Sequence, residues 1–342
     1  MPGPEPRRAA LKPFLGRSDA VARTGVVLAQ LGGPKTLEDV RPFIRSIIDD
    51  PCLVPLPGGA VTRRLLSSAV SLARSPRVRS HYAAIGGGSP ILSVTDAQAV
   101  ALREELGNRD HDVNVVVAQR HAAPDTEAAV AALLSSGVDR VVLLPLFPQY
   151  SATTTGSSEK KLRSVMSASG LTVPLHVVRS WCDHPSYLDA QARLVDEILV
   201  DLPEDADERP LVVFSAHGLP QRVVDGGDPY LEEIESTVAG VAARLGRSVD
   251  HTIAFQSRAG PVKWLAPDVR DVVASAGAEG RRSVVVVPIS FVSDHLETLY
   301  ELDIDLKRHA AEAGVAEFRR SRCFDSDPGV GPMLADIVEE HL

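Results

Sequence analysis

The chain has 342 residues, of which 44% are hydrophobic and 24% are charged, a composition typical of a soluble globular protein. Its formal net charge of -9 argues against non-specific nucleic-acid binding, and no apolar run approaches the ~20 residues that a transmembrane helix needs. The length exceeds that of one ordinary core and predicts two α/β domains.

Residues 1–24 contain arginines but lack the apolar segment of about 7–15 residues that marks a signal peptide, so we expect a loose leader there. The three cysteines, Cys52, Cys182 and Cys323, are far apart and form neither a disulfide framework nor a CxxC metal motif. A reducing cytoplasm is the simplest compartment for such a chain.

From residue 24 onward, short apolar runs alternate with stretches of helical pattern. This repeated order predicts an α/β fold with parallel sheets and helical crossovers. Strands are predicted at residues 24–31, 113–118, 141–147, 174–179, 211–216, 251–256 and 284–287, and helices begin at 36–39 and 93–96 or span 61–73, 126–135, 187–199 and 330–341.

Three loops between these elements allow two interpretations each. Residues 51–59, PCLVPLPGG, could form an exposed apolar lip or an ordinary packed loop. The glycines of 85–90, IGGGSP, could cradle a phosphate or make a backbone turn, and they match no complete phosphate fingerprint. The polar residues of 147–158, FPQYSATTTGSS, could bind carboxylates or cap a helix.

A faint internal duplication divides the chain into two similar lobes. VLAQLGGP at 27–34 resembles VFSAHGLP at 213–220, and two later pairs of segments match in the same order. In this comparison His217 occupies the place of Leu31, so only one lobe presents an imidazole to the cleft between them. The predicted domains are a first lobe at 25–172, a second lobe at 173–325 and a C-terminal helix at 326–342.

Candidate reactive residues follow two of the predicted buried strands, where open α/β sheets place their ligands. His217 comes directly after one strand, and Glu297 opens a helical pattern after another. A lone histidine is also common as a structural residue, and an acidic helix face is commonly just solvated. The residues that accompany Glu297 are Asp294 and His295 before it, and Glu301 and Asp305 at i+4 and i+8 on the same helix face.

One imidazole and one carboxylate form a sparse ligand set. Such a pair would bind a divalent metal transiently, with positions left open, or would act as general base and proton exit. Neither role needs a nucleophile, and the sequence has no GxSxG elbow.

Several longer motifs resemble those of one family. FSAHGLP, GDPY and above all SDHLETLYELD resemble ferrochelatase motifs, as do LGGPKTLEDVRPF, IGGGSPI and FPQYSATTTGSS, in order from about residue 25 to the end of the chain. The resemblance implies two Rossmann-like lobes of the class II chelatase type, with parallel sheets flanked by helices and an active-site cleft between the lobes. It also implies a lyase that inserts Fe2+ into protoporphyrin IX to form protohaem with release of two protons, the last step of haem biosynthesis.

The resemblance further implies roles for individual residues. The family's histidine falls on His217 and its carboxylate on Glu297, as catalytic residues or metal ligands, and the sequence leaves open whether His217 is the base or a ligand. The implied metal or proton path comprises Asp294, His295, Glu301 and Asp305, and the implied porphyrin pocket comprises Leu31, Arg120, Tyr150, Ser151, Trp264 and Phe291.

The identity of the porphyrin depends on one position. Leu31 is apolar where some relatives that prefer coproporphyrin carry a tyrosine, which favours protoporphyrin over the alternative, coproporphyrin III. Fe2+ is expected as a substrate, with no tightly bound cofactor and no [2Fe–2S] cluster, because Cys323 stands alone near the C-terminus.

Other expectations concern partners and rival functions. The lip at 51–59 lies at the mouth of the implied cleft and could make a peripheral membrane contact, and the oligomeric state is left open. The rival functions are a chelatase for another tetrapyrrole or metal, a non-catalytic tetrapyrrole- or haem-binding protein, and a nucleotide-binding α/β protein.

Overall fold

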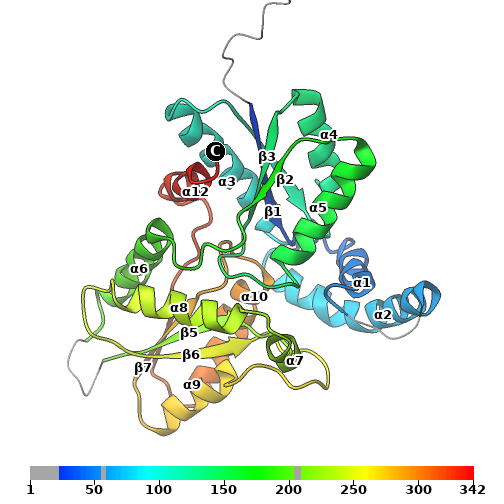
Figure 1. The fold of residues 1–342 in the computed structure, drawn as a ribbon. Coiled ribbons are helices and arrows are strands. Elements are labelled where there is room, and N and C mark those ends of the chain that lie inside the picture. Colours follow the sequence, from blue (N-terminus) through cyan, green and yellow to red (C-terminus); the bar gives the residue numbers. More distant parts are fainter. Residues whose placement is uncertain (1–22, 55–58, 204–208) are drawn as a thin grey trace, which may run out of the picture.

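The computed structural model describes residues 23–54, 59–203 and 209–342. The predicted leader lies outside these residues except for its last two positions, and the predicted lip lies outside them at 55–58. Two lobes are stacked along the long axis of the molecule, each built around one sheet with helices on its faces (Figure 1).

Both sheets have four parallel strands in the same order. In the first lobe the order is β2-β1-β3-β4, and in the second it is β6-β5-β7-β8. This repeat confirms the predicted α/β fold with two similar lobes. The strands are β1 (Thr24–Gln30), β2 (Val113–Gln119), β3 (Arg140–Pro145), β4 (Leu175–Val177), β5 (Leu211–His217), β6 (Asp250–Gln256), β7 (Ser283–Pro288) and β8 (Glu317–Arg320).

The register of the strands is also repeated between the lobes. β1 pairs with β3, and β5 pairs with β7, in registers that reach the terminal proline of each partner strand, Pro145 and Pro288. Proline ends each strand because it has no N–H to donate to the ladder. The shared register makes His217 the structural equivalent of Leu31, as the duplication in the sequence indicates.

Helices cover both faces of each sheet, which is the usual arrangement for buried parallel strands. A short π-helix interrupts the helical stretch that carries the acidic row. The helices are α1 (Val40–Asp49), α2 (Ala60–Ala84), α3 (Ile91–Asn108), α4 (Thr126–Ser136), α5 (Thr155–Ser169), α6 (Pro185–Leu199), α7 (Gln221–Asp225), α8 (Tyr230–Ala242), α9 (Val269–Ala278), α10 (Leu296–Leu299), the π-helix η1 (Glu301–Leu306), α11 (Lys307–Glu312) and α12 (Val330–Glu339).

One hydrophobic core runs through both lobes. It joins Leu28 and Leu144 of the first sheet to Phe214 and Val287 of the second, together with buried side chains from α3, α6, α8 and α12. Smaller cores lie between the first sheet and α4 and α5, and between the second sheet and α9, η1 and α11. Because the lobes share their main core, the loops at the ends of their strands are held in fixed relative positions.

Two helices differ in extent from the prediction. α1 begins at Val40 rather than at 36–39, because Thr36 donates both its N–H and its hydroxyl to Asp39 in a turn that precedes the helix. α2 continues to Ala84, past the predicted end at residue 73, although it contains Pro76. Pro76 has no N–H to donate to the carbonyl of Leu72, four residues earlier. The Ser75 hydroxyl donates to this carbonyl instead, at 3.2 Å.

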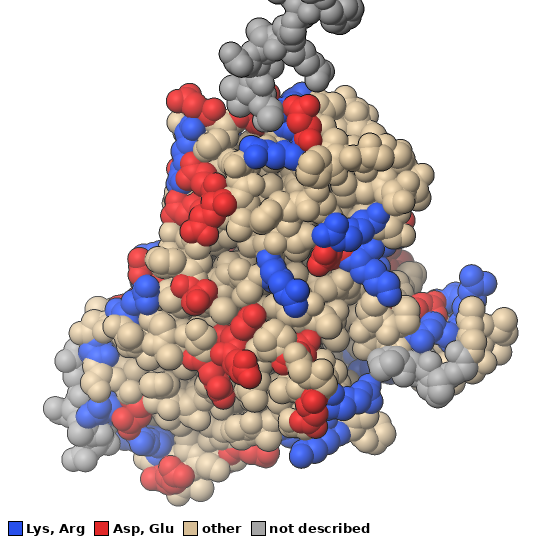
Figure 2. Space-filling view, in the orientation of Figure 1, with Lys and Arg blue, Asp and Glu red and all other residues tan. Residues whose placement is uncertain are grey.

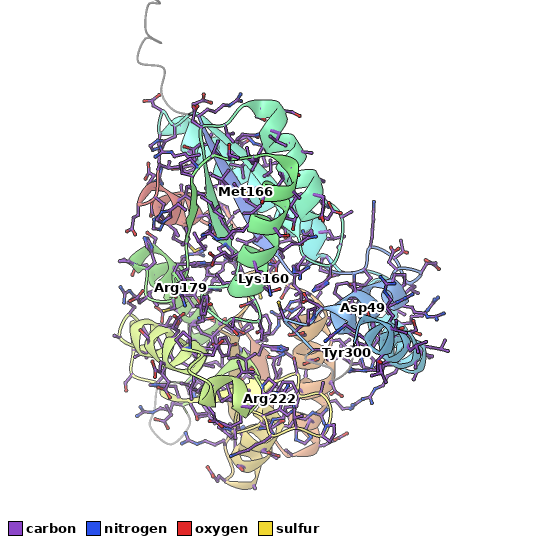
Figure 3. The ribbon with its side chains drawn as sticks, turned by 45° about the vertical axis from the view of Figure 1, so that its right-hand side comes forward. Asp49, Lys160, Met166, Arg179, Arg222 and Tyr300 are labelled. Carbon is purple, nitrogen blue, oxygen red and sulfur yellow. The ribbon has the colours of Figure 1, made fainter. Side chains whose placement is uncertain are left out.

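The helices α1 and α2 form a unit that projects from the body of the molecule (Figures 1 and 3). Its small core is centred on Val40, Ile44 and Tyr82, and Leu296 of α10 packs against it. The Tyr300 ring, just after α10, stacks on His81 of α2 with centroids 3.9 Å apart. Within the described ranges, no helix has both the length and the apolar character needed to span a bilayer.

Candidate active site

The end of β5 places His217 beside the loop that follows β7, because β5 and β7 are neighbours in the sheet. The His217 N–H donates to the hydroxyl of Ser290 at 2.9 Å, and the hydroxyl of Tyr230 donates to the His217 carbonyl at 3.0 Å. The backbone of this histidine is therefore fixed on both sides.

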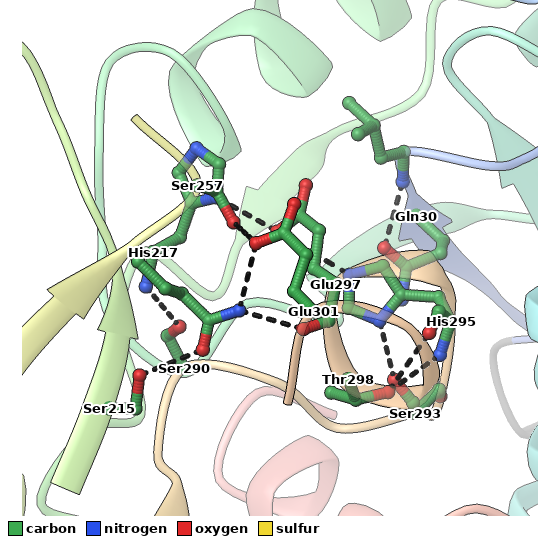
Figure 4. A network of polar contacts seen from close by, with 12 residues as sticks. Gln30, Ser215, His217, Ser257, Ser290, Ser293, His295, Glu297, Thr298 and Glu301 are labelled. Carbon is green, nitrogen blue, oxygen red and sulfur yellow. Dashed lines mark hydrogen bonds and ion pairs between the residues drawn. The ribbon is translucent and has the colours of Figure 1, made fainter. Parts of the chain in front are cut away.

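The loop after β7 leads into α10, which carries Glu297. The carboxylate Oε2 of Glu297 lies 2.8 Å from Nδ1 of His217 and 3.6 Å from Nε2 of His295 (Figure 4). Nδ1 of His295 faces the carbonyl of Ser293 at 3.1 Å, and since a carbonyl only accepts, Nδ1 carries the hydrogen. With Nδ1 of His217 engaged by Glu297, its other nitrogen, Nε2, is the one available to a molecule in the cavity.

Charge coupling sets the protonation of this pair. Burial disfavours a charged imidazole, but the Glu297 carboxylate outweighs it and raises the pKa of His217. Burial likewise favours a neutral acid, yet the imidazoles of His217 and His295 hold the pKa of Glu297 well below its usual range. Each partner therefore favours the charged form of the other, against the effect of burial on both.

A second carboxylate, Glu301, lies behind the first. Burial and the charge of Glu297 raise the pKa of Glu301 to about 7. Its Oε2 accepts hydrogen bonds from the Ser257 hydroxyl at 2.6 Å and from the Gln256 amide at 3.4 Å, and the same amide donates to the Glu297 carbonyl at 2.7 Å (Figure 4). A group with this pKa can both take up and release a proton near neutral pH.

The cavity beside His217 has a volume of about 210 Å³. Both lobes contribute to its walls, which are mostly apolar. Its lining includes Leu31, Leu53, Ile91, Leu146, Phe147, Ser151, Leu219, Trp264, Phe291 and Val292, together with His217, His295 and Glu297.

A model of the ferrochelatase family matches residues 23–342 of the chain. The chain belongs to the ferrochelatase family. It is 43% identical over 328 residues to a ferrochelatase of Synechococcus sp. (strain JA-3-3Ab), with 94% of each chain covered. It is 41% identical over 317 residues to that of Geotalea daltonii, covering 93% of this chain and 97% of the relative. It is 42% identical over 325 residues to that of Synechococcus sp. (strain RCC307), covering 94% and 83%.

Family membership makes the chain a metal chelatase of porphyrin and haem biosynthesis, which inserts a metal ion into a porphyrin. Among solved structures, the fold is similar to SirB from Bacillus subtilis with Fe3+, with a TM-score of 0.55, 12% identity, and 94% and 95% of the two chains covered. It is also similar to DR2241 from Deinococcus radiodurans, with a TM-score of 0.51, 13% identity, and 94% and 56% coverage. At these identities the likeness concerns the fold alone.

The structure brings together most of the residues that the sequence predicted for a ferrochelatase site. His217, His295 and Glu297 meet at the cavity, and Glu301 lies behind them. Of the predicted porphyrin contacts, Leu31, Ser151, Trp264 and Phe291 line the cavity.

Two predicted porphyrin contacts lie outside this lining. The Arg120 guanidinium pairs with the buried Asp50 at 2.5 Å and donates to the Ser157 hydroxyl at 3.1 Å. The guanidinium of Arg179 lies over the Tyr150 ring, with its carbon 4.2 Å from the ring centroid. Contact between either residue and a porphyrin stays a prediction.

Two members of the predicted path are paired with arginines rather than free for a metal. Asp294 accepts from the Arg320 guanidinium at 2.9 Å, and despite its burial this pairing lowers the pKa of Asp294. Asp305, within the π-helix η1, pairs with both Arg270 and Arg308. Their role in moving metal or protons stays a prediction.

No set of three or more His, Cys, Asp or Glu side chains is arranged as a metal site in the described part of the chain. A role of His217 and Glu297 as metal ligands stays a prediction. Cys182 and Cys323 are buried and Cys52 is half-buried, each as a free thiol.

Four site residues were not singled out from the sequence as members of the site. Tyr230 and Ser290 hold the His217 backbone, and Gln256 and Ser257 hold Glu301. Tyr230 belongs to the GDPY motif, Gln256 is the last residue of β6 and Ser257 follows it, so their positions at a motif or a strand end were the signals available.

Proposed function

We propose that this ferrochelatase inserts Fe2+ into protoporphyrin IX, forms protohaem and releases two protons, as the last step of haem biosynthesis. The observation that supports this most directly is the contact of 2.8 Å between His217 and Glu297 on the wall of a mostly apolar cavity to which both lobes contribute. The pair offers one proton acceptor and one anionic oxygen where a macrocycle would lie.

The chemistry follows from the substrate. A free porphyrin holds two pyrrole N–H protons inside a flat ring, so a metal ion cannot enter the plane. Bending the ring turns nitrogen lone pairs toward one face. Contacts between the macrocycle and apolar walls, to which Leu31, Trp264 and Phe291 contribute, would supply the free energy for that distortion.

Proton removal is assigned to His217 and Glu301. Nε2 of His217 accepts a pyrrole proton once the imidazole is neutral, and Glu297 either binds the incoming iron or passes the proton on. The Glu301 carboxylate, whose pKa is raised to about 7 by burial and by Glu297, receives protons from the pair and releases them toward Asp305. A role for His217 as an iron ligand is the alternative assignment.

The insertion reaction is tested anaerobically with Fe2+ and each of two porphyrins, followed by the absorption change of the ring. Turnover of protoporphyrin IX in preference to coproporphyrin III supports the proposal. Preference for coproporphyrin III would mean that coproporphyrin III, and not protoporphyrin IX, is the substrate. Tight haem binding without insertion would mean that the protein is a haem carrier. A Leu31→Tyr variant should lower the preference for protoporphyrin, because a phenol hydroxyl then enters an apolar wall.

We also propose a peripheral membrane contact through the lip and the outer face of α2. Val61, Leu65 and Leu72 are 73%, 68% and 57% exposed on this helix, beside exposed arginines such as Arg64 and Arg74. Basic side chains mark the outer end of the α1–α2 unit (Figure 2). This combination suits an anionic lipid surface.

Flotation with vesicles that contain anionic lipid tests the contact. Leu65→Glu should reduce the bound fraction, while Val200→Glu, a control at a 74% exposed position elsewhere, should not. Equal binding of both variants would contradict the contact. Free cysteines throughout the described residues are consistent with a cytoplasmic location, which we propose as well.

A further inference from the structure

The loop between β3 and α5 belongs to the first lobe but is held by carboxylates of the second. Ser151, Thr153 and Thr154 of this loop line the cavity. The loop is joined to the segment that contains the GDPY motif and the start of α8, which lies where the two lobes meet and where acidic side chains gather (Figures 1 and 2).

Asp228 makes the main connection. Its Oδ2 accepts hydrogen bonds from the Ser151 hydroxyl at 3.0 Å and from the Ala152 N–H at 2.8 Å, and its Oδ1 accepts from the Tyr230 N–H at 3.1 Å. The Ser151 side chain is wholly buried. Hydrogen bonds to a carboxylate are roughly twice as strong as neutral ones, so this contact fixes the loop firmly.

A second carboxylate supports the first. Oε2 of Glu233 accepts from the Tyr150 N–H and from the Ser180 hydroxyl, both at 2.6 Å. The Tyr150 ring is covered by Arg179, which lies at the junction of the lobes (Figure 3). Two adjacent residues of the loop are therefore anchored to α8 and the turn before it.

The same segment also holds the other wall. Two residues after Asp228, the Tyr230 hydroxyl donates to the carbonyl of His217 at 3.0 Å, and the Tyr230 side chain is only 5% exposed. Within three residues, the chain binds the loop of the first lobe and the backbone of the catalytic histidine in the second. The distance between these two parts of the cavity is thus set by one short, buried connection.

We propose, on the basis of the iron-insertion function above, that Asp228 is a positioning residue that keeps the Ser151–Thr154 wall at a fixed distance from His217 while the porphyrin bends. The cavity wall can distort the porphyrin ring only if the wall residues keep their positions. If the wall becomes mobile, the protein still binds a flat macrocycle but no longer distorts it. The effect therefore appears as a lower kcat and as a flatter bound ring.

The experiment uses Asp228→Asn in the full chain. The amide has one acceptor oxygen, so it cannot serve both the Ser151–Ala152 side and the Tyr230 side. We expect kcat for iron insertion to fall about 10- to 100-fold, which is the size of effect that a small misplacement causes. The KM for the flat porphyrin and the affinity for an N-methylated porphyrin, whose ring is bent before it binds, should change less than threefold. Resonance Raman spectra should show weaker out-of-plane modes in the bound flat porphyrin.

Asp225→Asn is the matched control. Asp225 is exposed on α7, three residues earlier, where it accepts only from Gln221 at 3.0 Å among the contacts described, and its variant should behave as the wild type. Glu233→Gln provides a second test if Asp228→Asn does not fold, and it should lower kcat and the out-of-plane modes in the same direction.

Wild-type kcat in both Asp228→Asn and Glu233→Gln would overturn the inference. A reduced kcat with unchanged out-of-plane modes would also overturn it, because the carboxylates would then act only on the stability of the fold. The proposed function has a separate criterion, since it fails if the wild-type chain itself inserts no iron.

Discussion

The charge of Glu297 can be removed with little change of shape by Glu297→Gln. In the wild type this carboxylate accepts from His217 at 2.8 Å and lies 3.6 Å from His295, and it raises the pKa of His217 against the effect of burial. In the variant, both contributions of Glu297 are lost and burial is opposed only by the charge of Glu301, so the pKa of His217 falls.

The size of the effect follows from the contacts that are lost. A positioned acid–base group contributes typically about 10²- to 10⁴-fold to a rate, which corresponds to about 2.7–5.4 kcal/mol of activation free energy. The free energy of unfolding should fall by about 1.5–3 kcal/mol, the worth of a hydrogen bond to a charged group. The loss stays below that of a broken buried ion pair because His217 can release its proton.

The assay is anaerobic insertion of Fe2+ as a function of pH, with Glu312→Gln as the control, since Glu312 is an exposed carboxylate farther along the same helical stretch. In the wild type the raised pKa of His217 keeps the base protonated at low pH, so kcat/KM rises as the pH increases through the apparent pKa of the pair. In Glu297→Gln the rise of kcat/KM should occur at lower pH, and the maximal kcat/KM should be lower. The same maximal kcat/KM and the same pH of the rise as in the wild type would refute the reasoning.

Two further predictions concern stability. Arg320→Met should lower the free energy of unfolding in urea by about 3–5 kcal/mol, because Arg320 is 9% exposed and pairs with Asp294 at 2.9 Å and Asp303 at 2.7 Å, and a loss below about 1 kcal/mol would contradict the pairing. Burial, and to a smaller extent the charge of Arg120, lowers the pKa of His121 from 6.5 to about 4. The buried neutral imidazole therefore contributes about 3 kcal/mol to the free energy of unfolding above pH 6.5, and this contribution is lost as the pH falls from 6.5 to 4. His121→Asn should remove that pH dependence, and parallel stability curves for variant and wild type would contradict it.

The strands were predictable where they are buried on both faces. The four valines of β7 are wholly buried, and this run was visible in the sequence as an uninterrupted apolar segment. β8 was missed because it is a short edge strand, Glu317–Arg320, whose residues are all half-exposed and mostly charged. An edge strand does not need apolar residues on both of its faces, so its sequence pattern resembles that of a loop.

The central pair of the site was predictable from topology. His217 ends β5 and Glu297 comes after the neighbouring parallel strand β7, and the carboxyl ends of such strands meet at one edge of the sheet. The π-helix that begins at Glu301 was not predictable, since the i, i+4 spacing of the acidic residues indicates an ordinary α-helix.

Contacts between distant residues could not be predicted. The ion pair between Arg120 and Asp50 joins residues 70 positions apart, and nothing in the local sequence marks that pairing. Ser257 adopts a positive φ of 65° and donates to Glu301, although a non-glycine residue carries no local signal for this conformation.

The most direct test compares the wild type with His217→Ala under anaerobic conditions, with Fe2+ and protoporphyrin IX and with porphyrin binding measured in the same samples. The account predicts that both proteins bind the porphyrin and that only the wild type converts it to protohaem. Conversion by His217→Ala at the wild-type rate would contradict the claim that this imidazole, paired with Glu297, carries out the insertion.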